Sequence, residues 1–191
     1  MKMLWTSLKK HKKSMLFINI IFLLGLISGI IYFYMVKDSI VLNLQEELLN
    51  VQFSSNILYH IIFLAVIFLF SYLGLGVFIG LFLYFYEALS IGFVLATYFS
   101  LAGLSGVLYA IIYVTLFKAF YIFLMSLVLI KTFKLVKSII GYFVLHKDSD
   151  MKDSILISSV NIAKYIIIIL VYDIFLIFLG NQILSIFNFL I

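Results

Sequence analysis

Residues 57–101 read ILYHIIFLAVIFLFSYLGLGVFIGLFLYFYEALSIGFVLATYFSL, an apolar run whose only formal charge is Glu87. An α-helix rises about 1.5 Å per residue and needs about 20 apolar residues to cross a hydrocarbon core of about 30 Å. The run is about twice that length, so it predicts two membrane-spanning helices folded against each other. Lipid is therefore the expected solvent for this part of the chain.

The turn between these two helices is expected at a cluster of glycines near the middle of the run. Gly74, Gly76 and Gly80 lie within seven residues of one another, and glycine is the usual residue of tight turns. This placement gives one span at about 57–75 and the next at about 77–100. A break near Glu87 is the alternative.

The composition of the whole chain of 191 residues indicates a membrane protein. Hydrophobic residues make up 66% and charged residues 11%, a balance far from that of soluble domains. Cysteine is absent, which excludes disulfides and thiolate chemistry, and proline and arginine are absent too. Their absence, together with abundant Ile, Phe, Tyr, Asn and Lys, indicates an AT-rich genome. We therefore expect the cell membrane of a bacterium.

Three further apolar segments predict three more spans, at about 15–36, 107–130 and 157–179. The first follows a lysine-rich start and lacks a small-residue cleavage site, so we interpret it as a retained anchor with a cytoplasmic N-terminus. Counting five crossings puts the basic loop 131–154 on the cytoplasmic side as well, and its five lysines agree with that side. The expected fold is an all-α polytopic bundle of about five transmembrane helices, forming one integral membrane domain over residues 1–191.

Two polar segments flank the predicted spans. Segment 37–56 has apolar residues at helical spacing and predicts an external amphipathic helix on the outer leaflet or, alternatively, a partner-binding helix. Its candidate partner surface consists of Leu44, Glu46, Glu47 and Leu48. In the basic segment, the lysines recur at about one-turn spacing, so we expect a helix that bends along the cytoplasmic surface and contacts anionic lipids rather than nucleic acid. These lysines are Lys131, Lys134 and Lys137.

Four charged residues fall inside predicted spans, where each costs at least a few kcal/mol unless it is paired or faces water. Glu87 and Lys118 lie about 18 Å and about 16 Å from the outer ends of consecutive antiparallel spans, which predicts an ion pair. Asp173 is a candidate second partner for Lys118. Lys164 is close enough to the inner boundary to snorkel. The pair serves either to fix the register of two helices or to form part of a proton or solute pathway.

Small residues recur at four-residue spacing, which allows close helix packing in lipid, either within the bundle or against another subunit. They are Gly25 and Gly29, Gly76 and Gly80, and Ala88 and Gly92. No spacing typical of a metal site, a catalytic triad or a phosphate-binding loop is present. We therefore expect no cofactor, no metal and no enzymatic activity.

The layout also resembles the stage II sporulation protein M family over nearly the whole chain. The resemblance rests on the basic N-terminus, on Gly25-Leu-Ile-Ser-Gly29, on Leu73-Gly-Leu-Gly76, on Glu87-Ala-Leu-Ser-Ile-Gly-Phe93 and on Gly103-Leu-Ser-Gly106. The family commonly has Lys-Gly where this chain has Glu87-Ala88, and a polar motif where this chain has Leu116-Phe117-Lys118. Reciprocal changes at positions 87 and 118 are expected if the two residues touch.

The resemblance implies a non-enzymatic membrane scaffold that recruits partners such as extracytoplasmic peptidoglycan hydrolases during engulfment or envelope remodelling. Oligomerisation and contacts with other membrane proteins fit this role. The alternative function is a membrane subunit of a transporter or permease complex that uses Glu87, Lys118 and Asp173. Five spans are few for a complete carrier, so this alternative requires assembly with further subunits.

Overall fold

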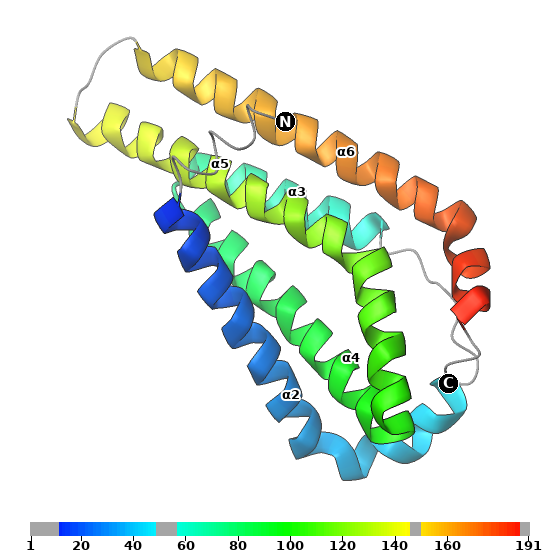
Figure 1. Cartoon of the computed structure of the whole chain (residues 1–191). Coiled ribbons are helices and arrows are strands. Elements are labelled where there is room, and N and C mark those ends of the chain that lie inside the picture. The colour runs from blue at the N-terminus through cyan, green and yellow to red at the C-terminus, as the bar shows by residue number, and fades with distance from the viewer. Residues whose placement is uncertain (1–11, 49–56, 146–149, 188–191) are drawn as a thin grey trace.

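The computed structural model describes residues 12–48, 57–145 and 150–187, and in these ranges the chain forms helices and short turns without strands (Figure 1). The elements in chain order are α2 (Lys12–Leu48), α3 (Ile57–Tyr72), α4 (Gly76–Tyr113), the π-helical turn η1 (Val114–Lys118), α5 (Ala119–Leu145) and α6 (Asp150–Phe187). Three helical stretches are long and apolar enough to cross a membrane, namely Ser14–Lys37, Gly76–Tyr142 and Ile155–Gly180. A shorter apolar helix covers Leu58–Tyr72. The predicted all-helical membrane class is confirmed at this level.

The turn between α3 and α4 is centred on Gly74, within the predicted glycine cluster. The Leu75 N–H donates to the Phe70 carbonyl at 3.0 Å and the Gly74 N–H donates to the Ser71 carbonyl at 3.2 Å. Gly74 has φ +79°. This pattern of bonds around a left-handed glycine is a Schellman motif, which satisfies the last carbonyls of a helix. Helix α4 then passes through Glu87 without interruption, so the alternative break near Glu87 is not adopted.

A second reversal lies inside α4, at Gly103. Gly103 has φ 58° and ψ −132°, a conformation open essentially to glycine alone. Just beyond it, a Cβ added at Gly106 would overlap the Tyr98 carbonyl oxygen, which shows how closely the two arms approach. The chain returns from Gly103 alongside the helix that led to it (Figure 1). The expected short turn at 102–106 thus connects the two arms of a long helical hairpin.

The returning arm changes direction at η1 before it continues as α5 (Figure 1). Within η1 the Ala119 N–H donates to the Val114 carbonyl, five residues back, and such π-turns are an established cause of helix kinks. The Tyr172 hydroxyl of α6 donates a hydrogen bond to the Leu116 carbonyl in this turn. The bend expected after residue 130 was therefore misplaced: it lies at residues 114–118, inside the predicted span 107–130.

The first part of the basic segment 131–154 is helical, as the spacing of its lysines predicts. Residues 131–145 continue α5 as helix, because Leu135 and Ile139 are buried in the main core together with Ile162 of α6. Lys131 and Lys134 are half-buried and Lys137 is exposed. Residues 146–149 lie outside the described residues, and α6 begins at Asp150.

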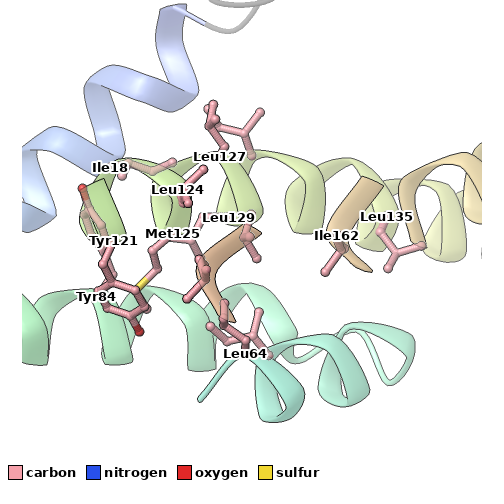
Figure 2. Packing of buried hydrophobic residues seen from close by; sticks show 14 of the residues in the cluster. Ile18, Leu64, Tyr84, Tyr121, Leu124, Met125, Leu127, Leu129, Leu135 and Ile162 are labelled. Carbon is pink, nitrogen blue, oxygen red and sulfur yellow. The ribbon is translucent and has the colours of Figure 1, made fainter. Parts of the chain in front are cut away.

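The main core lies between α5 and its neighbours α3, α4 and α6, with Ile18 of α2 at its edge (Figure 2). Large side chains of α5, including Tyr121, Met125 and Leu129, are fully buried. Helix α2 packs along α4 (Figure 1). It continues as helix through Leu48, so the predicted segment 37–56 begins inside α2, while residues 49–56 lie outside the described residues.

Candidate functional site

Glu87 and Lys118 form a buried ion pair. The Lys118 Nζ donates to the Glu87 Oε2 at 3.1 Å, and the two side chains are 14% and 2% exposed, respectively. Gly103 lies 16 residues after Glu87 and 15 residues before Lys118. Because the two arms of the hairpin are almost equally long, the two charges reach the same level of the bundle.

Lys118 is the last residue of η1, at the point where the chain turns into α5. A π-turn widens the helix by one residue and rotates the following side chains. Such turns occur frequently at functional sites. Here the turn places the Lys118 ammonium group beside the Glu87 carboxylate of α4 instead of on the lipid-facing side.

Asp173 pairs with His60 and not with Lys118. The His60 Nδ1 lies 2.8 Å from the Asp173 Oδ2, and the two side chains are 6% and 5% exposed. The expectation that Asp173 serves Lys118 is therefore wrong. Helix α6 packs against α3, and this contact brings the carboxylate to the imidazole near the start of α3.

Two tyrosines lie between the Glu87–Lys118 pair and the His60–Asp173 pair. Tyr59 of α3 is close enough to the Glu87 carboxylate to interact with it electrostatically. Tyr121 of α5 stacks on the His60 ring, with centroids 3.8 Å apart and an interplanar angle of 16°. It also interacts electrostatically with both Glu87 and Asp173. The six side chains thus form one group, which we call the polar cluster: Tyr59, His60, Glu87, Lys118, Tyr121 and Asp173.

The polar cluster contains buried hydrogen-bonding atoms without a partner. These are the His60 Nε2 and the Tyr121 hydroxyl. Buried polar atoms are nearly always paired in folded proteins, and each exception calls for an explanation such as a ligand, a water or a catalytic role. Among the described residues, no group of three or more His, Asp or Glu side chains could hold a metal ion. The two unpaired atoms are those in the polar cluster that could hydrogen-bond a further polar molecule.

The predicted small residues fall into two sets. Gly25, Gly29, Ala88 and Gly92 lie where α2 meets α4, and a Cβ added at Gly29 or Gly92 would overlap a carbonyl oxygen of the facing helix. Gly76 packs against Ser71 within the α3–α4 turn, and Gly80 packs against Leu129 of α5. All of these contacts are internal to the chain.

The remaining predicted residues lie away from the polar cluster. Leu44, Glu46, Glu47 and Leu48 belong to the last turns of α2, and their side chains lie outside the described part of the structure. Lys131, Lys134 and Lys137 follow one another along α5. Lys164 of α6 is exposed, as a snorkelling lysine would be.

Tyr59, His60 and Tyr121 are the residues of the polar cluster that the sequence-based reasoning missed. The histidines were judged by metal-ligand spacing, and His60 is 113 residues away from its partner Asp173. One signal was available: His60 and Glu87 are the only strongly polar titratable groups in the apolar run 57–101. A polar residue in such a run needs a partner, which singles out His60.

No protein-family model, curated protein or solved structure matches this chain.

Proposed function

We propose that this chain crosses the membrane five times, with its N-terminus in the cytoplasm, and acts as a membrane subunit of a transporter or permease. In this proposal a small polar or ionic solute contacts the polar cluster on its path across the membrane. The five spans comprise α2, α3, the two arms of the Gly103 hairpin with α5 continuing the second arm, and α6. The lysine-rich N-terminal segment and the lysine-rich segment 131–154 would both lie in the cytoplasm, which supports this orientation.

The observation that favours transport is the number of polar groups gathered at one point. A single ion pair is enough to fix the register of two helices. Here the Glu87–Lys118 ion pair and the His60–Asp173 hydrogen bond, drawn from α3, α4, η1 and α6, meet around Tyr121 of α5, and two buried atoms have no partner in the described part of the chain. Ionisable groups at membrane depth are costly and mark ion or solute pathways more often than structural contacts.

The outward faces of the helices support a lipid environment around this site. Leu23, Leu24 and Ile27 of α2 and Ile167 and Phe178 of α6 are among the exposed large hydrophobic side chains. The charges of the polar cluster point inward instead. An apolar exterior with a polar interior is the arrangement that a transport subunit needs.

The test is an electrical measurement on the reconstituted protein. Solid-supported membranes would receive a panel of amino acids, sugars, organic cations and inorganic anions, with the wild type compared with the Glu87→Gln/Lys118→Met double variant. We expect at least one solute to give a current that the folded double variant lacks. Lys164→Met is the matched control. It removes an exposed lysine of α6 that is not part of the polar cluster, so this variant should keep the current. Absence of current from the wild type, alone and co-purified with its partners, would contradict the proposal.

A membrane scaffold of the stage II sporulation protein M type is the second candidate. Helix α2 favours it, because its 37 residues exceed the roughly 20 that cross a hydrocarbon core, and its last turns bend away from the arm that runs along α4 (Figure 1). The protruding turns include Glu46 and Glu47, which would form a docking surface for cell-wall hydrolases. Affinity purification from native membranes separates the candidates: recovery of extracytoplasmic hydrolases supports a scaffold, and recovery of a nucleotide-binding ATPase supports a transporter subunit.

A further inference from the structure

The contact between His60 and Asp173 fixes which nitrogen of the imidazole is free. An ionised carboxylate only accepts hydrogen bonds, so the His60 Nδ1 must carry the hydrogen that is donated to the Asp173 Oδ2 at 2.8 Å. In the neutral ring the Nε2 then holds a lone pair. That atom is buried and has no hydrogen-bond partner in the described part of the chain. In a histidine oriented in this way by a carboxylate, the far nitrogen is the atom left to accept a proton.

The charges near His60 balance when the His60–Asp173 pair holds one more proton. His60 contacts Asp173 of α6, stacks on Tyr121 of α5 and lies beside Tyr59 of α3, and the Glu87–Lys118 pair of α4 and η1 completes the polar cluster. Glu87 and Lys118 cancel each other. With Asp173 ionised and His60 neutral the polar cluster carries one negative charge, and one proton taken up by the pair removes it. A low-dielectric interior disfavours a net charge.

The stacked ring of Tyr121 acts in the same direction. It covers one face of the imidazole at a centroid distance of 3.8 Å. The face of an aromatic ring is negative and attracts a cation. Tyr121 is thus a positioning residue that holds the His60 ring in place and also stabilises its cationic form.

We infer that the His60–Asp173 pair is a proton-binding site of this protein, with the His60 Nε2 as the atom that takes up the proton. One N–H bond forms on uptake and the same bond breaks on release, with water as donor and acceptor of the proton. The Nδ1–H bond to Asp173 persists throughout. This inference deepens the proposed function by naming the proton as an ion bound at that site, but proton binding itself does not require transport.

Nitrogen NMR on the whole protein in lipid nanodiscs tests the inference directly. The variant His11→Gln/His146→Gln leaves His60 as the sole histidine, and ¹⁵N-labelled histidine then reports both ring nitrogens. Between about pH 5 and pH 9, a range around the ordinary pKa of histidine, we expect one reversible protonation at Nε2 and an Nδ1–H tautomer in the neutral form. In Asp173→Leu the neutral ring should lose this tautomer preference, whereas Tyr121→Phe, which keeps the stacked ring, should retain it.

The inference is overturned if the ring nitrogens of His60 stay in one protonation state across that range. Subtracting the spectrum of His60→Gln from that of the wild type gives the same answer should the single-histidine variant not fold. Proton exchange at His60 without any solute current would leave the proton site standing and contradict the proposed transport. Solute currents from a protein whose His60 stays in one protonation state would support the proposed transport and contradict the proton site.

Discussion

The Glu87 carboxylate has its lysine partner across the hairpin and is almost fully buried. Removing one member of a buried ion pair leaves the other charge uncompensated, which typically costs about 3–5 kcal/mol. Replacing both members by neutral groups of similar size removes that penalty. The energetic role of the pair can therefore be separated from its functional role.

We predict that Glu87→Gln and Lys118→Met each destabilise the protein by about 3–5 kcal/mol, and that the double variant loses clearly less than either single variant. Thermal unfolding in mild detergent, followed by size-exclusion chromatography, measures the effect. Lys164→Met should leave the melting temperature near that of the wild type because this lysine is exposed. A double variant whose loss equals the sum of the single losses would contradict a direct pair.

A second prediction at this scale concerns the Tyr172 hydroxyl, which donates to the Leu116 carbonyl in η1. Tyr172→Phe removes this donor to a carbonyl of the π-turn, and because the bond is exposed we expect the ordinary loss of about 0.5–1.5 kcal/mol. Tyr34→Phe is the control because Tyr34 is exposed on α2. Equal melting temperatures for the two variants would show that the hydroxyl does not stabilise the kink.

At the scale of elements, the sequence predicts the turns better than the kink. Gly74 and Gly103 adopt positive φ where the chain reverses. Because glycine is the usual residue at positive φ, a glycine in the sequence indicates where such a turn can lie. The π-turn has no comparable marker, because the chain contains no proline and Val114–Lys118 looks like ordinary apolar helix. Its position depends on tertiary contacts such as the one from Tyr172.

The contact between α2 and α4 yields a prediction about helix packing. A Cβ at Gly29 or Gly92 would overlap the backbone of the opposite helix, and a backbone cannot move aside as a flexible side chain can. We expect Gly29→Ala and Gly92→Ala each to cost at least about 1–3 kcal/mol, the usual range for overpacking.

The melting temperature in detergent again measures this loss. The matched control is Ile27→Ala, which changes an exposed side chain of the same helix. If the glycine variants melt with the wild type and only Ile27→Ala is destabilised, α2 does not pack on α4 through its small-residue face.

At the scale of the whole molecule, pairings within the hairpin follow from the sequence while pairings between distant helices do not. Glu87 and Lys118 are set at one level by the nearly equal arms around Gly103. His60 and Asp173 meet because α3 and α6 lie side by side, and the order of helices along the chain does not determine which of them become neighbours. Of the two pairs in the polar cluster, only the Glu87–Lys118 pair could therefore be predicted from the sequence.

The proposed topology places the end of α2 outside the cell and the α5–α6 connection in the cytoplasm. The chain contains no cysteine, so Glu47→Cys and Lys147→Cys each introduce a single label site. In intact cells we expect a membrane-impermeant maleimide to modify position 47 at once and position 147 only after permeabilisation, because an odd number of crossings separates them. Equal labelling of both positions in intact cells would exclude the five-crossing topology on which the proposed orientation of the polar cluster rests.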